Sequence, residues 1–174
     1  MTLETLKQAG SGWSKILGSR PDWEAHFRLD AEGMNAGFLA FGAAVLAAIV
    51  LATLRFGFPP PLAMALVVIQ HLLPLLALFI ATGLLTRFTA FAGSSARFVV
   101  PGLYLLAVMK LVEGLATLLG VPLAGAILAV TGFLGFRLAR ANGLTLAPAV
   151  GYGLALFVLL AVLPIALYML VNAF

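Results

Sequence analysis

The fold is decided by residues 98–119, FVVPGLYLLAVMKLVEGLATLL. A helical crossing of a lipid bilayer takes about 20 predominantly apolar residues, and this stretch is long and apolar enough to make one. It also carries two charges, Lys110 and Glu113, which lie three residues apart and therefore on the same face of a helix. The stretch predicts a transmembrane helix that holds an ion pair within the membrane.

The rest of the chain has the composition of a membrane protein. Of its 174 residues, 63% are hydrophobic and 9% are charged, whereas a soluble domain carries roughly a quarter charged residues. Residues 56–86 and 141–174 contain no charged residue at all. The net charge of +4 is explained by basic loops beside a membrane, so we do not expect nucleic acid as a partner.

Five apolar segments are predicted to cross the membrane. The turns between them carry helix-breaking residues, such as three consecutive prolines at 59–61 and a Gly-Val-Pro sequence at 120–122. The sequence thus predicts an all-α polytopic fold with a transmembrane domain over residues 34–174. Its crossings are expected at residues 34–54, 62–86, 98–119, 123–138 and 146–171.

Residues 1–33 differ from the rest because they hold nine of the sixteen charged residues. Apolar residues recur there at helical spacing, which predicts an amphipathic segment on the cytoplasmic surface of the membrane. Trp13 and Trp23 are expected to anchor this segment at the level of the lipid headgroups. A loosely ordered tail is the alternative that the same composition permits.

The basic residues of the loops predict the orientation of the chain. With a cytoplasmic N-terminus, eight basic residues lie on the inner side, Arg55 alone lies on the outer side, and Lys110 lies within the membrane. This bias follows the positive-inside rule, and five crossings then leave the C-terminus outside. The eight inner residues are Lys7, Lys15, Arg20, Arg28, Arg87, Arg97, Arg137 and Arg140.

Small residues repeat at helical spacing in two of the crossings. In lipid, helices associate mainly through close packing, and small residues allow their backbones to approach. The sequence therefore predicts two helix-packing faces. They are Ala36, Ala40, Ala44, Ala48 and Ala52 in the first crossing, and Gly125, Ala129 and Gly132 in the fourth.

Polar groups of three crossings are predicted to lie at one depth. With a rise of about 1.5 Å per residue, Lys110 and His71 each lie roughly 13 Å from the outer ends of their crossings. Pro74 and Pro164 add two backbone carbonyls, because a proline leaves the carbonyl four residues earlier without its donor. The predicted hydrogen-bonded cluster comprises the side chains of Gln70, His71, Lys110 and Glu113 and the carbonyls of Gln70 and Leu160.

Three interpretations of this layer remain open. It can be structural, with the polar groups joining three helices. It can be functional, with His71 and Glu113 passing protons, or binding a small polar or anionic group together with Lys110. In the third interpretation, Lys110 extends toward the membrane surface and does not meet the second crossing.

The sequence contains no catalytic motif, metal-binding pattern or phosphate-binding glycine loop. It has no cysteine, which excludes disulfides and thiolate ligands. We therefore predict no catalytic residue, no cofactor and no metal, and a protein that is not an enzyme.

Two stretches resemble the Yip-type membrane proteins in their short bacterial form. They are Trp13-Ser-Lys-Ile-Leu-Gly-Ser-Arg-Pro21, and Phe91-Ala-Gly-Ser-Ser-Ala-Arg97 followed by Pro101 and Tyr104. The five predicted crossings and the short C-terminal tail are also similar to that family. Its eukaryotic members bind small GTPases in membrane trafficking, but this chain lacks their acidic Asp-Leu-Tyr-Gly-Pro segment. The resemblance therefore implies a fold, without GTPase binding and without catalytic residues.

The sequence predicts an integral protein of a bacterial inner membrane with a non-catalytic function. We expect an organising or adaptor subunit that binds lipids, other membrane proteins or further copies of itself through its small-residue faces and N-terminal segment. The alternative is a small protein that translocates protons or a solute through the layer of Lys110, Glu113 and His71.

Overall fold

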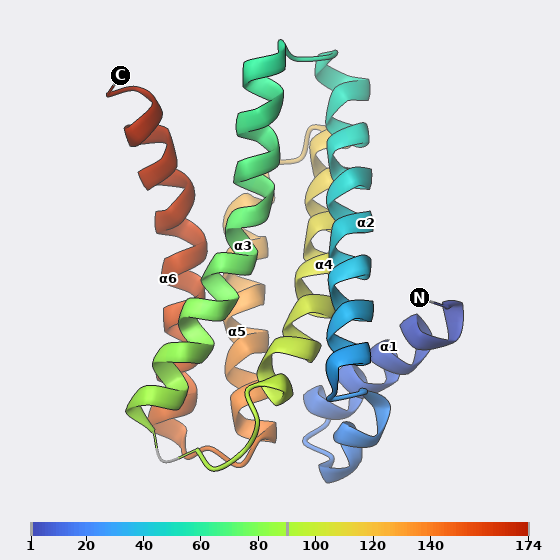
Figure 1. Cartoon of the computed structure of the whole chain (residues 1–174), viewed down its shortest axis with the longest axis vertical. Helices are drawn as coiled ribbons and strands as arrows, with labels where there is room; N and C mark the ends of the chain where they lie inside the picture. Colours follow the sequence, from blue (N-terminus) through green and yellow to red (C-terminus); the bar gives the residue numbers. More distant parts are fainter. Residues whose placement is uncertain (1, 90, 174) are drawn as a thin grey trace.

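The structure is a computed structural model that describes residues 2–89 and 91–173 (Figure 1). Five long helices of the described chain have the length and apolar composition to cross a membrane, so the predicted all-α multi-pass fold is confirmed. Their bounds follow the predicted crossings, and the largest differences are the start of the first helix at Ala31 and the end of the fourth at Ala141. The helices are α1 (Leu3–Leu17), the 3-10 helix η1 (Pro21–His26), α2 (Ala31–Phe56), α3 (Pro61–Phe88), α4 (Ala96–Leu119), α5 (Ala124–Ala141) and α6 (Leu146–Val171).

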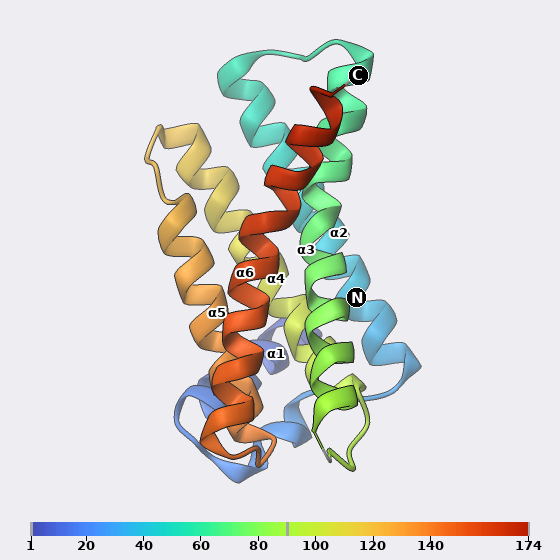
Figure 2. The same ribbon diagram turned by 90° about the vertical axis from the view of Figure 1, so that its left-hand side faces the viewer.

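The bundle has two ends of different character (Figure 1). At one end, which we call the basic end, α3 and α5 finish, α4 and α6 begin, and α1 and η1 lie against them. The arginines of this end are Arg87, Arg97, Arg137 and Arg140. The opposite end carries the α2–α3 and α4–α5 turns and the end of α6, and none of the described helices lies across it (Figures 1 and 2).

Polar side chains fix helix termini at both ends. Asp30 Oδ1 accepts a hydrogen bond from the Gly33 N–H at 2.8 Å, which begins α2 ahead of the predicted crossing. At the opposite end, Arg55 donates to the carbonyls of Thr117 at 2.9 Å and Leu118 at 3.2 Å, in the last turn of α4. Arg55 thus gives the Leu118 carbonyl a partner and adds a second donor to the Thr117 carbonyl, which also accepts from the Gly120 N–H.

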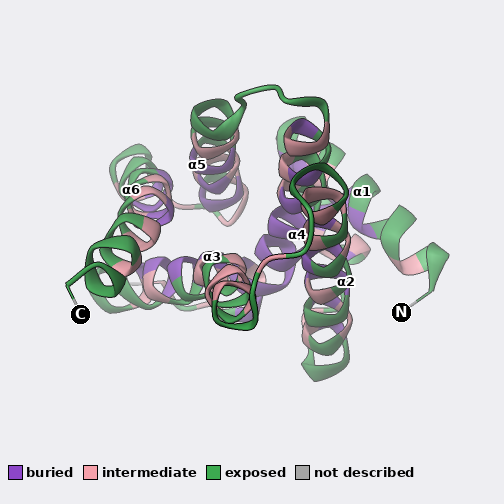
Figure 3. Cartoon of the chain, turned by 90° about the horizontal axis from the view of Figure 1, so that it is seen from above, coloured by how far each residue is buried: buried purple, intermediate pink, exposed green. Residues whose placement is uncertain are grey.

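α4 is the most buried of the five long helices and packs on α2, α3 and α5 (Figure 3). A Cβ added at Gly114 of α4 would lie 2.8 Å from the Cα of Ala48, so α2 and α4 touch through their backbones. The predicted alanine face lies on the buried side of α2, with its middle three members buried and its outer two half-buried. These alanines are Ala36, Ala40, Ala44, Ala48 and Ala52.

Glycines also bring α5 and α6 together, but only toward the basic end. A Cβ added at Gly132 would lie 3.0 Å from the carbonyl oxygen of Gly153. Gly125 and Ala129, which we predicted to pack together with Gly132, are exposed instead. The reason is that α6 diverges from α5 with increasing distance from the basic end, so that α6 does not pack closely on the first half of α5 (Figures 1 and 2).

The N-terminal segment is folded onto the basic end and is not a loose tail. Trp23 is 1% exposed, and its indole N–H donates to the Ala141 carbonyl at 3.2 Å. Trp13 is half-buried and donates to the Pro101 carbonyl at 3.1 Å. The predicted headgroup anchoring is therefore wrong for Trp23, and Trp13 also turns toward the protein, because each indole N–H finds a carbonyl of a long helix.

Two glycine-to-alanine changes should have opposite effects on stability, because only one of them lies at the α2–α4 contact. Gly114→Ala places a methyl group 2.8 Å from the Ala48 Cα, and such overpacking typically costs about 1–3 kcal/mol of unfolding free energy. Gly83→Ala in α3 meets nothing within 4 Å and should gain up to about 1 kcal/mol from helix propensity. Thermal unfolding of the two purified variants in detergent measures this difference, and equal melting temperatures would contradict the contact.

Candidate functional site

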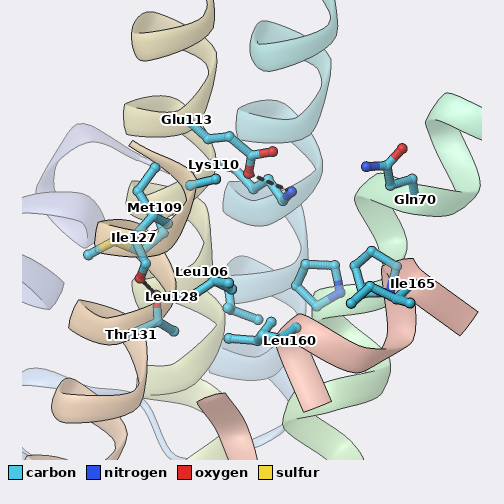
Figure 4. Close-up of a pocket in the computed structure, with 14 residues that line it drawn as sticks. Gln70, Leu106, Met109, Lys110, Glu113, Ile127, Leu128, Thr131, Leu160 and Ile165 are labelled. Atoms are coloured by element: carbon cyan, nitrogen blue, oxygen red, sulfur yellow. Dashed lines mark hydrogen bonds and ion pairs between the residues drawn. The ribbon is translucent and has the colours of Figure 1, made fainter. Parts of the chain in front are cut away.

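A pocket of about 340 Å³ opens between α3, α4, α5 and α6 (Figure 4). It lies toward the opposite end of the bundle, where α6 leans away from α5. The lining comprises Gln70 and Pro74 from α3, Leu106, Met109, Lys110 and Glu113 from α4, Ala124, Ile127, Leu128 and Thr131 from α5, and Leu160, Ala161, Pro164 and Ile165 from α6.

Two prolines make the walls of the pocket more polar than their side chains suggest. Pro74 lies inside α3 and Pro164 inside α6, and neither has a backbone N–H to donate. The carbonyls of Gln70 and Leu160, four residues earlier, consequently lack their helical partner, and both residues line the pocket. Each proline thus leaves one carbonyl without its helical donor in a residue that lines the pocket.

The charged wall of the pocket is the ion pair of α4. Lys110 Nζ donates to Glu113 Oε2 at 2.7 Å, and the pair lies one turn apart along the helix (Figure 4). The side chain of Lys110 is 10% exposed and that of Glu113 is 40% exposed, so the carboxylate is the more accessible partner. The ammonium ends at Glu113 and not at the end of the helix, so the interpretation in which Lys110 reaches the membrane surface does not apply.

The predicted single hydrogen-bonded cluster is not formed. The Gln70 amide lies across the pocket from the ion pair (Figure 4). His71 is absent from the lining, and its Nδ1 lies 2.8 Å from the Val67 carbonyl of its own helix. Depth along α3 does not determine on which side of the helix each side chain lies.

The pocket can exchange hydrogen bonds with a ligand. An ammonium group has three N–H donors, and the described residues give Lys110 one partner, Glu113. The exposed carboxylate of Glu113 can take up or release a proton, and the Gln70 amide can donate or accept. These groups suit a small polar or anionic molecule, or a proton.

Two buried polar groups were missed by the sequence reasoning. Thr131 is 1% exposed on the α5 wall, and its hydroxyl donates to the Ile127 carbonyl at 2.7 Å. The sequence could have indicated Thr131, because it is the one uncharged polar side chain of residues 123–138. Nearer the basic end, the Thr82 and Tyr152 hydroxyls lie 3.3 Å apart and join α3 to α6 below the pocket. Nothing in the sequence pairs these two residues.

The fold defines an integral membrane protein of the multi-pass α-helical class. No protein-family model, curated protein or solved structure matches the chain. The resemblance to Yip-type proteins therefore stays a prediction.

The ion pair predicts strongly non-additive effects of substitution. Glu113→Gln leaves the buried Lys110 without its charged partner, and the loss should cost about 1–3 kcal/mol because Glu113 itself is partly exposed. Adding Lys110→Met removes the buried charge itself, so the double variant should regain most of that stability. A double-mutant cycle of unfolding free energies, measured in detergent, gives the coupling between Lys110 and Glu113.

The control for this cycle is the exposed pair of Arg28, in the loop between η1 and α2, and Glu32, in the first turn of α2. A cycle with Arg28→Met and Glu32→Gln should give a coupling free energy below about 1 kcal/mol. Equal coupling in the two cycles would show that Lys110 and Glu113 do not lie in a low-dielectric site.

Proposed function

We propose that this protein binds and translocates protons or a small polar solute through the Lys110–Glu113 pocket. The observation that carries the proposal is the cavity of about 340 Å³ that reaches an intramembrane ion pair. A structural ion pair needs no space around it, and ionisable groups within a membrane are functional candidates by default. A pocket lined by the ion pair and by the Gln70 amide supports binding better than a purely structural role.

The direction of access follows from the charge distribution. Eight basic residues at the basic end and the N-terminal segment, against Arg55 at the opposite end, favour a cytoplasmic basic end. The pocket then lies toward the outer side of a bacterial inner membrane. A solute anion entering from there can take over the N–H donors of Lys110, while the Glu113 carboxylate takes a proton from hydronium in the outside solution and releases water. Solute binding and proton uptake are coupled in this scheme.

An adaptor function is the second candidate, and a separate observation favours it. Gly125 and Ala129 form part of a small-residue face that is exposed, and nothing lies within 4 Å of a Cβ added at Gly125. Such a face permits close approach of a helix from another subunit. In this second candidate, the polar pocket has only a structural role.

Proton flux in proteoliposomes separates the two functions. A vesicle loaded with a pH-sensitive dye and driven by a potassium diffusion potential should acidify faster with the protein than without it. Glu113→Gln should reduce the flux to that of empty vesicles, because an amide does not titrate. Glu32→Gln, which removes an exposed carboxylate at the start of α2, should keep the full flux.

Either of two results would overturn proton translocation through Glu113. One is a wild-type flux equal to that of empty vesicles. The other is a Glu113→Gln variant that conducts as well as the wild type. The adaptor function, in which the pocket has only a structural role, predicts the first of these results.

A further inference from the structure

A second polar pocket, of about 300 Å³, lies at the basic end, far along the bundle from the Lys110–Glu113 pocket. It lies where the end of α1 meets the end of α5. Ser19, Arg20, Arg137 and Arg140 supply its polar side chains, and no carboxylate is among the described residues that line it. We call it the arginine pocket.

Arg137 is oriented by the end of α1. Its Nη2 donates to the Leu17 carbonyl, to the Ser19 hydroxyl at 2.7 Å and to the Ile16 carbonyl at 3.3 Å. Among the described residues, all bonds of this guanidinium use Nη2, so Nε and Nη1 are available to a ligand. The group is therefore held in place before any ligand arrives, which reduces the entropic cost of binding.

Ser19 occupies a backbone position that favours glycine. Its φ of 55° is left-handed, and among the described non-glycine residues it alone has a positive φ. The position closes α1, with the Ser19 N–H bonded to the Ile16 carbonyl and the Arg20 N–H to the Lys15 carbonyl. Glycine would fit this turn with less strain, but it would lack the hydroxyl that holds Arg137.

The carboxylates near the pocket are engaged by other cations. Lys15 pairs with Asp22, and its hydrogen bond holds the pKa of that carboxyl below the usual range. Glu24 pairs with Arg97. The exposed Arg20 and Arg140 have no carboxylate partner among the described residues, so the pocket keeps a positive charge.

The pocket also lies beside an apolar groove. The groove has a volume of about 520 Å³, and Leu17 of α1 and Leu134 of α5 line it. Ile16 and Arg137, which line the arginine pocket, are their close neighbours on the same two helices. Arg137 and Arg140 belong to the last turns of α5, where the apolar span ends. A positive pocket at the membrane boundary thus adjoins an apolar groove along the span.

We propose that the arginine pocket binds the phosphate of an anionic phospholipid, with an acyl chain of the same lipid in the adjoining groove. Guanidinium groups bind phosphate oxygens through paired N–H donors, and basic pockets at the ends of membrane helices suit anionic headgroups. Free phosphate shares this headgroup chemistry but would leave the groove without a role.

Titration of the detergent-solubilised full chain with short-chain phosphatidylglycerol tests the proposal, with phosphatidylcholine as the neutral lipid and inorganic phosphate as the soluble anion. Native mass spectrometry measures the bound fraction. Phosphatidylglycerol should bind saturably and more tightly than phosphatidylcholine. The double variant Arg20→Gln/Arg140→Gln should weaken it about 30-fold, since each basic residue contributes about 5-fold near a headgroup. Arg137 is left in place because it holds the end of α1.

The matched control is Lys7→Gln/Arg87→Gln, which removes the same charge from exposed positions outside the pocket. It should bind phosphatidylglycerol like the wild type. Inorganic phosphate is the soluble alternative. If it binds the wild type saturably, and does so only when Arg20 and Arg140 are present, the phosphate site is confirmed but its ligand is soluble and not a lipid. The site is disproved if Arg20→Gln/Arg140→Gln binds phosphatidylglycerol as tightly as the wild type. It is also disproved if Lys7→Gln/Arg87→Gln loses as much affinity for this lipid as Arg20→Gln/Arg140→Gln does.

Discussion

An ion pair inside an apolar span cannot face hydrocarbon, and this constraint governs the arrangement of the bundle. Moving a single unpaired ion to the bilayer centre costs at least about 3 kcal/mol, so α4 has to be enclosed by protein or to face water. Around Lys110, α4 has packed protein on one side and a pocket on another. α2 covers one side of α4 through a backbone contact between Ala48 and Gly114, while α3, α5 and α6 surround a pocket on another side. The fold therefore combines a tightly packed contact and a cavity on the same helix.

The two ends of the bundle differ in how far they are closed by other parts of the chain. At the basic end, indole and guanidinium groups bond to backbone carbonyls, and α1 and η1 close the bundle. At the opposite end, Arg55 caps α4, and α6 leans outward (Figure 1). Rigidity at one end and space at the other suit a protein that admits a ligand from one side of the membrane. The proposed phospholipid at the basic end would strengthen that closed end further.

Much of the fold could be predicted from the sequence, because hydropathy and proline-rich turns determine where membrane helices begin and end. The alanine face of α2 was also predictable, since a four-residue repeat stays on one side of a helix. The partners of side chains were not predictable. The failure at Gly125 came from the outward lean of α6, which no local pattern encodes. The headgroup role expected for Trp23 was wrong because aromatic composition does not distinguish a lipid contact from the carbonyl of a neighbouring helix.

The candidate site was predicted in part. Charge and depth identified Lys110, Glu113 and Gln70, and the structure places these three around one cavity. His71 satisfied the same depth argument and lies outside the lining, because depth along α3 does not fix the direction around it. Thr131 was overlooked because it carries no charge, although it is buried at the wall.

The central claim is that water reaches the ion pair from the end opposite the basic end, and cysteine accessibility tests it most directly. The chain has no native cysteine, so single substitutions give an unambiguous signal. Ile127→Cys lies on the pocket wall, and Val130→Cys lies on an exposed face of the same helix outside the lining. A charged thiol reagent that cannot cross membranes reacts with thiolates in water and not in lipid. The account predicts fast labelling of Ile127→Cys from the outside alone and slow labelling of Val130→Cys. Equally slow labelling of both, or labelling of Ile127→Cys from the cytoplasmic side alone, would contradict it.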